Sequence, residues 1–505
     1  MTISDIYLAA CAIASVVTSL RWLRVAQREH YLPLSATQFA IRWWKQGGTN
    51  SSLFLLAVIT TVTSAWIPAT SLVTAAVIIS GPIGLGVKGR TSALAWTRRL
   101  RTLAAVSFFA IAAIFVIVRQ LNIRSVGYAV IALLVPCFLD IALTALKPIE
   151  QKMARRYVVD ASAKLERVNP IRVAITGSYG KTTIKGYVRH LLSDTFSVTA
   201  SPASFNNSAG LSRSVNEHLA DGTEVFVAEM GTYGPGEIAE LVNWVQPSIS
   251  VLASIGPVHL ERFGDLETIV SAKSEIFSTS RTAVINIDAY GLAKEADRLQ
   301  ASGIKVIRCS AQDHAADVFA WYDDGLSVSV SGRTIVTGVA TDAAATNVAC
   351  AVAVATSLGV SDGTIAKQLA DLPVTEHRRQ TLTSPTGVTI IDDTYNSNPA
   401  GANLALQTLA NLDARRRVVV TPGMVELGSR QASENRRFGV DASLIADDLI
   451  IVGHTNRSAL NNGARDGTAR VKLVRTRNDA TEWVRANLTS GDAVLYENDL
   501  PDHYA

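Results

Sequence analysis

Residues 171–183 join a short apolar segment, a tight turn and the start of a helix, and no other stretch constrains the fold as strongly. The apolar run 171–175 predicts a buried strand, and Gly177 and Gly180 predict a tight turn after it. Residues 181–183, Lys-Thr-Thr, then open a helix. Backbone N–H groups of such a turn, with the positive end of a helix dipole, form a cradle for phosphate. The segment therefore predicts an α/β domain that binds a phosphate-bearing ligand.

The same segment carries side chains suited to phosphate chemistry. The Lys181 ammonium is placed to reach the outer phosphates of a nucleotide, and the Thr182 hydroxyl is placed to bind Mg²⁺. The usual phosphate-binding loop has four residues between its glycines, whereas two separate Gly177 from Gly180. A general nucleotide-binding motif therefore describes the segment poorly, and the shorter loop needs its own explanation.

Length and composition separate a membrane part from a cytosolic part. The 505 residues are enough for three or four domains. The mean hydropathy of +0.22 is high, and nearly all of the apolar excess precedes residue 146. The basic residues behind the net charge of +4 cluster beside apolar segments, which favours a membrane surface over nucleic acid. The four cysteines lack CxxC spacing, so we expect no disulfide framework or zinc site and a reduced, cytosol-facing catalytic part.

Apolar segments predict a transmembrane helical domain over residues 1–150, with about five spans. The segments are residues 6–20, 51–85 (two linked spans), 103–118 and 126–146. Four spans with an interfacial helix near Trp43 and Trp44, or buried helices of a soluble protein, are the alternatives. Asp140 is a lone intramembrane acid to which we assign no function, because such an acid commonly faces a neighbouring helix or water.

The distribution of basic residues predicts the orientation of these spans. Lys and Arg gather in the loops after the first, third and fifth segments, whereas the alternate loops carry few of them. This bias places the N-terminus outside and everything from Lys147 onward in the cytosol.

Polar residues follow three predicted strands of the second domain, residues 151–375. Glu229 ends one apolar strand and His259 follows another, and both would lie with the phosphate loop at the carboxyl edge of a parallel sheet. There they are plausible Mg²⁺ ligands. The pair Asn206-Asn207 is ordinary turn chemistry, and Lys273 lies on a predicted helix that Asp265 caps. From composition alone we expect Lys273 to be a solvated charge.

Five motifs in order resemble the Mur ligase superfamily, the ATP-dependent amide ligases of peptidoglycan assembly. They come closest to the MurF branch, which adds D-Ala-D-Ala to a muramoyl tripeptide. The motifs are Gly177-Ser-Tyr-Gly-Lys-Thr-Thr183, Ser204-Phe-Asn-Asn207, Glu229-Met-Gly231, Gly256-Pro-Val-His-Leu-Glu-Arg-Phe-Gly264 and Ala272-Lys-Ser-Glu-Ile-Phe277. In residues 376–505, alternating strands and helices predict a small doubly wound, Rossmann-like domain, and its segment from Asp392 to Pro399 resembles a MurF motif that lies over the nucleotide and positions the amine.

The resemblance implies a role for each matching residue. The catalytic residues would be Lys181, Glu229, His259 and Lys273. Two Mg²⁺ ions would be held by Thr182, Glu229, His259 and Lys273, the last carbamylated by CO₂. ATP would contact Thr176, Gly177, Ser178, Tyr179, Gly180, Lys181, Thr182, Thr183, Asn347, Arg378 and Asp393. The substrates would contact Asn206, Asn207, Tyr395, Asn396 and Asn398.

The implied reaction makes an acyl phosphate from a substrate carboxylate and ATP, and an amine then displaces the phosphate. The family's adenine-contacting segment keeps only Asn347, and the usual Lys-Gly-Ser-Arg ending is replaced by an acidic one from Tyr496 to Tyr504. These departures leave the amine donor open, as D-Ala-D-Ala or another amino acid or dipeptide.

The part of MurF that binds the uridine nucleotide has no room in this chain. About 25 residues separate the last predicted span from Ile171, too few for a core. We therefore expect a bacterial inner-membrane enzyme whose acceptor is lipid-linked or presented at the membrane, with basic loops that favour an anionic lipid surface. The alternatives are a poly-γ-glutamate synthase-like ligase and a membrane scaffold that binds ATP without ligating.

Overall fold

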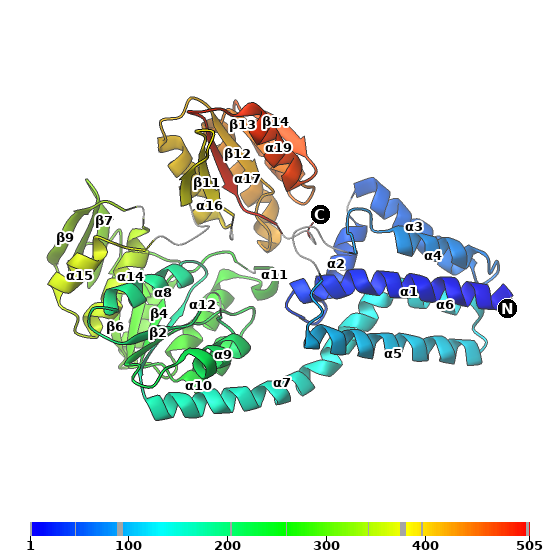
Figure 1. Cartoon of the computed structure of the whole chain (residues 1–505), viewed down its shortest axis with the longest axis horizontal. Coiled ribbons are helices and arrows are strands. Elements are labelled where there is room, and N and C mark those ends of the chain that lie inside the picture. The colour runs from blue at the N-terminus through cyan, green and yellow to red at the C-terminus, as the bar shows by residue number, and fades with distance from the viewer. Residues whose placement is uncertain are drawn as a thin grey trace. The chain divides into compact units, whose positions relative to one another are not determined.

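The computed structural model describes residues 3–45, 47–87, 94–202, 205–258, 260–341, 343–373, 380–394, 397–500 and 504. The chain divides into two compact units, Met1–Met153 with Leu500–Ala505, and Ala154–Asp499. Figure 1 shows a helical first unit and a second unit in which helices surround two sheets. The predicted domain bounds at 150 and 375 stay predictions.

The first unit is built from helices. They are α1 (Ile3–Arg28), α2 (Ser35–Trp44), α3 (Gly47–Thr63), α4 (Thr70–Ser80), α5 (Arg98–Gln120), α6 (Arg124–Leu133) and the first part of α7 (Val135–Val168). Their core contains Trp22, Trp43, Leu100 and Leu139. Many other apolar side chains on these helices are exposed, Phe109 at 78% among them. An apolar surface of this kind is what a lipid environment would cover.

Two helices of the described residues, α1 and α5, are long and apolar enough to cross a membrane. A third span results if α6 and α7, which meet at a bend of 62°, count as one. The predicted pair within residues 51–85 forms the shorter helices α3 and α4. The count of five spans therefore stays a prediction.

Asp140 has a structural role in this unit. Its carboxylate accepts hydrogen bonds from the backbone N–H groups of Ala36 (3.2 Å) and Thr37 (2.8 Å) at the start of α2. The first N–H groups of a helix lack partners within the helix, so a carboxylate there stabilises the helix end. The acid thus faces a neighbouring helix.

The larger sheet of the second unit has nine strands in the order β2-β3-β1-β4-β5-β6-β7-β8-β9. The strands are β1 (Ile171–Thr176), β2 (Val198–Ala200), β3 (Val225–Glu229), β4 (Ile249–Leu252), β5 (Thr282–Asn286), β6 (Lys305–Ser310), β7 (Val318–Tyr322), β8 (Leu326–Val330) and β9 (Arg333–Val339). Pairing is parallel from β2 to β7 and antiparallel from β7 to β9. The predicted strand before the glycine turn is confirmed as β1.

Helices cover both faces of this sheet (Figure 1). One apolar core joins α8 (Lys181–Leu192), α14 (Ala345–Ser357) and α15 (Asp362–Leu369) to one face. The other core joins α9 (Ser208–His218), α10 (Glu237–Val245), α12 (Leu266–Ser274), α13 (Leu292–Ala301) and the end of α7 to the opposite face. The short helices α11 (Leu260–Phe263) and η1 (Glu275–Phe277) flank α12. Because β1 lies between β3 and β4 and all three strands are parallel, the segments that follow them lie together at the carboxyl ends of the strands.

The smaller sheet has six strands in the order β10-β11-β15-β12-β13-β14, all parallel except β10. They are β10 (Gln380–Thr383), β11 (Thr389–Asp393), β12 (Arg417–Thr421), β13 (Asp448–Val452), β14 (Arg470–Val474) and β15 (Ala493–Glu497). Its helices are α16 (Pro399–Asn411), η2 (Gly428–Arg430), α17 (Gln431–Ile445), α18 (Arg457–Ala464) and α19 (Arg477–Asn487). The alternation of strands and helices that was predicted for residues 376–505 is present.

Candidate active site

The glycine turn between β1 and α8 has a backbone shape that its sequence requires. Gly180 adopts a left-handed conformation with φ of +79° and directly precedes α8. A Cβ on this residue would lie 2.6 Å from Oδ1 of Asn347, so the start of α14 lies against the turn. Glycine is therefore needed here for both conformation and space. The contact also brings Asn347, the implied adenine ligand, beside the loop.

The loop is held to the segment after β4. The Ser178 N–H donates to Ser254 O (2.9 Å), and the Tyr179 N–H donates to Ser254 Oγ (2.7 Å). The Ser178 hydroxyl contacts both the N–H and the carbonyl of Gly256. The Tyr179 ring lies so close to Gly256 that a Cβ there would meet it at 2.4 Å. These contacts fix the loop conformation, and burial raises the pKa of the Tyr179 phenol above its ordinary value.

Two lysine amines meet at one carbonyl of the loop. Nζ of Lys181 donates to Gly177 O at 2.7 Å, and Nζ of Lys273 donates to the same oxygen at 3.2 Å. Lys273 is 4% exposed, so the expectation of a solvated charge was wrong. Burial, and secondly the nearby Lys181 ammonium, hold the pKa of Lys273 well below its ordinary value. The site therefore favours a neutral amine at Lys273.

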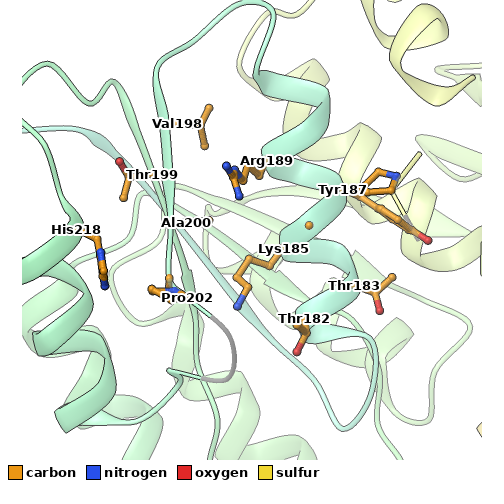
Figure 2. A pocket seen from close by; sticks show the side chains of 13 residues that line it. Thr182, Thr183, Lys185, Tyr187, Arg189, Val198, Thr199, Ala200, Pro202 and His218 are labelled. Atoms are coloured by element: carbon orange, nitrogen blue, oxygen red, sulfur yellow. The ribbon is translucent and has the colours of Figure 1, made fainter. Parts of the chain in front are cut away.

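Glu229 lies at the centre of a buried polar cluster. Its carboxylate accepts hydrogen bonds from Thr182 Oγ1 (3.0 Å) and Asn206 Nδ2 (3.3 Å). It also forms an ion pair with Lys185 Nζ at 3.0 Å, in which the two side chains are 2% and 7% exposed. The Thr182 and Lys185 contacts come from α8 (Figure 2), and the Asn206 contact comes from the loop before α9. The cluster fixes the position of the carboxylate beside the phosphate loop.

The Thr182 hydroxyl and the Glu229 carboxylate suit Mg²⁺. Their oxygens are 3.0 Å apart, and hard oxygen donors are what this ion prefers. The described residues contain no group of three or more His, Cys, Asp and Glu side chains that could hold a metal. His259, the implied ligand of a second ion, lies outside the described residues, as do Arg378, Tyr395 and Asn396.

Other predicted site residues have local structural contacts. Thr176 is fully buried, and its hydroxyl donates to Met230 O (2.8 Å). Asn207 and Asn398 cap α9 and α16 through their side chains. Thr183, on the first turn of α8, lines a groove along that helix. Asp393 ends β11 in the smaller sheet and is buried.

Sequence reasoning missed Lys185. It lies four residues after Lys181 and three after Thr182, so all three share one face of α8. This spacing was the available signal, but an amphipathic surface helix gives the same pattern.

Glu497 forms a second buried site at the end of β15. Its carboxyl group accepts hydrogen bonds from the hydroxyls of Ser397 and Thr421. Burial, with a smaller contribution from Asp393, raises the pKa of Glu497 to about 7 despite these hydrogen bonds. The acidic ending noted in the sequence thus begins with a carboxyl group inside the domain.

Replacing Glu497 with glutamine is expected to flatten the pH dependence of stability. The folded pKa is raised, so the wild-type group stabilises the fold fully below its unfolded pKa and loses that contribution as pH rises through about 7. The loss amounts to about 3 kcal/mol, at about 1.4 kcal/mol per pKa unit. Urea unfolding at several pH values between about 4.5 and 8 measures it. Equal pH slopes for wild type and Glu497→Gln would contradict the assignment, and Glu482→Gln on α19 is the control.

Comparisons with known proteins agree with this fold. The family described as "Mur ligase middle domain" matches residues 175–355, and "Mur ligase, glutamate ligase domain" matches residues 377–496. The two matched regions contain the phosphate loop, the Glu229 cluster and the smaller sheet. The fold of the second unit is that of a Mur-type ligase. The chain belongs to the Mur ligase family, and within it the chain is MurF-like.

Individual relatives support the MurF-like assignment. UDP-N-acetylmuramoyl-tripeptide–D-alanyl-D-alanine ligase of Mycobacterium tuberculosis is 33% identical over 347 residues, 64% of this chain and 66% of that protein. The Bacillus subtilis ligase of the same name is 26% identical over 368 residues, 71% of this chain and 77% of that protein. The chain thus spans just under two thirds of the mycobacterial relative.

A solved structure also supports the MurF-like assignment. The MurF ligase of Thermotoga maritima in complex with ADP matches with a TM-score of 0.57 and 25% identity, over 68% of this chain and 80% of that one.

Proposed function

We propose that this protein is an ATP-dependent ligase that joins a carboxylate acceptor to an amine donor in peptidoglycan precursor synthesis. The observation that carries the proposal is the convergence of Lys181, Thr182 and Glu229 at one edge of the larger sheet. The MurF relatives act on a UDP-linked muramoyl tripeptide and D-Ala-D-Ala by name, and the ADP in the Thermotoga structure supports ATP as the nucleotide.

Each residue of the site has a separate role in the proposed reaction. The loop amides and Lys181 hold the outer phosphates of ATP while a substrate carboxylate attacks the γ-phosphorus. The bond between the γ-phosphorus and the bridging oxygen breaks, ADP leaves, and an acyl phosphate is formed. Asn206 and Lys185 keep the Glu229 carboxylate in place beside Thr182. An amine then attacks the acyl carbon of the acyl phosphate, and inorganic phosphate leaves. Bound Mg²⁺ supplies charge neutralisation at the phosphates.

Lys273 is proposed to act as a carbamate. A neutral amine is the form that adds to CO₂, and burial beside Lys181 favours that form. Carbamylation turns the amine into an anionic oxygen ligand beside the Lys181 ammonium. His259 and this carbamate are proposed as ligands of the second ion, while Asn347, Arg378 and Asp393 are proposed to contact the nucleotide.

We further propose that the enzyme acts at the bacterial inner membrane as a multi-pass protein, with the ligase domains in the cytosol. Two long apolar helices support membrane attachment. A lipid-linked or membrane-presented acceptor follows if the helical unit takes the place of a nucleotide-binding domain. The amine donor is D-Ala-D-Ala or another amino acid or dipeptide, contacted by Asn206, Asn207, Tyr395, Asn396 and Asn398.

ATP-dependent phosphate release by the purified full-length protein tests the proposal. We expect release only when both an acceptor and an amine are present, with lipid-linked and UDP-linked tripeptide as acceptors and D-Ala-D-Ala, single amino acids and glutamate as donors. Normal rates with the soluble UDP-linked tripeptide and none with lipid-linked acceptors would contradict action at the membrane. Release with glutamate alone would favour a poly-γ-glutamate synthase-like enzyme. No release with any pair would favour an ATP-binding scaffold.

A further inference from the structure

A groove in the first unit lies between α1 and α5, the two helices that are long and apolar enough to cross a membrane. It has a volume of about 410 Å³, and Figure 1 shows the two helices side by side. Its lining includes Leu8, Ala12, Val16, Phe108, Ala112 and Phe115. Among the described residues that line it, Ser15 alone is polar, and its hydroxyl donates to Cys11 O (2.8 Å). The groove therefore offers a ligand apolar contacts.

The two helices run in opposite directions, which brings their basic ends together. At one end of the pair, Arg119 of α5 forms an ion pair with Asp5 of α1 (3.1 Å). At the other end, Gln27 of α1 accepts a hydrogen bond from the N–H of Ala95, just before α5 (3.0 Å). The basic start of α5 thus lies near the basic end of α1. This is the side that the distribution of Lys and Arg predicts to face the cytosol.

Arg101 lies in line with the groove at this end. It precedes Phe108 by seven residues and Phe115 by fourteen, so all three share one face of α5. The helical rise puts about 10 Å between Arg101 and Phe108 along the axis. Arg101 is exposed, and among the described residues no acidic side chain pairs with it, whereas the nearby Arg99 bonds to Glu150 (2.6 Å). The Arg101 guanidinium can therefore pair with an anion at the end of the groove.

A lipid with an anionic headgroup complements these two features. In a bilayer its hydrocarbon chain would fill the groove, and the long Arg101 side chain would reach its phosphate at the membrane surface. The groove is one hollow between two helices, with the small side chains of Ala12 and Ala112 in its lining. One hollow suits one hydrocarbon chain, whereas a bulk phospholipid has two.

We infer that this groove holds the hydrocarbon chain of a single-chain lipid phosphate that carries the acceptor, with Arg101 pairing with the phosphate. The inference rests on the proposed ligase function at the membrane, and it adds the site at which the lipid carrier binds. Arg101 is then a binding residue outside the ligase domains.

Photo-crosslinking in the absence of turnover tests the groove. The full-length protein in phosphatidylcholine nanodiscs is labelled with farnesyl phosphate that carries a diazirine at the end of its chain, and mass spectrometry maps the labelled peptides. We expect labels within residues 8–16 and 108–115. Farnesyl phosphate without the diazirine should compete for the site. Farnesol, which lacks the phosphate, and dioleoyl phosphatidylglycerol, which has two chains, should each compete at least about tenfold less well.

Two variants on α5, each with a matched control, separate the headgroup from the chain. Arg101→Gln should raise the farnesyl phosphate concentration needed for half-competition at least about tenfold, because a charge-assisted hydrogen bond is lost. Arg119→Gln, at the other end of the helix, should change it less than about twofold. Ala112→Trp should fill the groove and abolish labelling there. Val106→Trp adds the same side chain at an exposed position outside the groove lining and should leave the labelling unchanged.

Labelling that ignores both Arg101→Gln and Ala112→Trp would overturn the inference. Equal competition by phosphatidylglycerol would also overturn it, because the groove would then bind bulk lipid. Absence of phosphate release with every acceptor would instead refute the ligase function, because the labelling needs no turnover.

Discussion

Replacing Glu229 with glutamine is expected to abolish nearly all ligase activity and to destabilise the second unit. The amide keeps the size of the side chain but removes the anionic oxygen beside Thr182, which we expect to lower kcat about 100- to 1000-fold. It also leaves the Lys185 ammonium buried without its counter-charge. Breaking a buried ion pair from one side costs about 3–5 kcal/mol. Phosphate-release kinetics and urea unfolding measure the two effects on one protein.

A double variant separates the two roles of the carboxylate. Lys185→Met removes the unpaired cation from Glu229→Gln, so Glu229→Gln with Lys185→Met should recover most of the lost stability without recovering activity. Arg213→Gln, which breaks an exposed pair with Glu217, should move the unfolding midpoint little. A double variant no more stable than Glu229→Gln would show that the 3.0 Å contact does not set the electrostatics of the cluster.

Lys273→Ala should nearly abolish activity, with partial rescue by a short carboxylic acid. The alanine removes the buried amine that bonds to Gly177 O, which is the amine proposed to react with CO₂. We expect kcat to fall at least about 1000-fold, as for loss of a group that stabilises charge in the transition state. Acetate can enter the space left by the side chain and supply the missing carboxylate. Steady-state kinetics with and without acetate is the measurement.

A second variant distinguishes carbamylation from packing. Lys273→Met fills the buried space with an apolar side chain, so it should fold like wild type, remain inactive and show no rescue. Removal of CO₂ and bicarbonate should lower the activity of the wild type. Adding bicarbonate back should restore that activity. Full activity of Lys273→Ala, or indifference of the wild type to CO₂, would show that no carbamate is needed.

Much of the fold was predictable because its signals are local. The apolar run 171–175, the two glycines and Asp265 before α12 each act within a few residues, and β1, the turn and the Asp265 cap are present. The position of Glu229 beside the phosphate loop was predictable because the carboxyl ends of neighbouring parallel strands lie close together. The number of membrane spans was harder to predict from the sequence. The apolar stretch 51–85, for example, contains α4, which has only 11 residues.

The contacts among the site residues could not be predicted. Lys185 and Lys273 both lie on helices and have the spacing of exposed charges, yet both are buried. Whether a helical lysine is solvated depends on which elements pack over it, and its neighbours in the sequence do not carry that information. The contact of Asn206 could not be predicted either. Its sequence neighbourhood indicates a turn, but it does not indicate that the Asn206 amide donates to Glu229.

The sequence by itself determined the phosphate loop, the α/β alternation of the last two thirds and the family resemblance, because these depend on residue order over short distances. The tertiary structure alone decided the burial of Lys273 against Gly177 and the Lys185–Glu229 ion pair. Each of these contacts joins residues that are far apart in the sequence. The contacts therefore form only after α8 has packed on the sheet that contains β1 and β3.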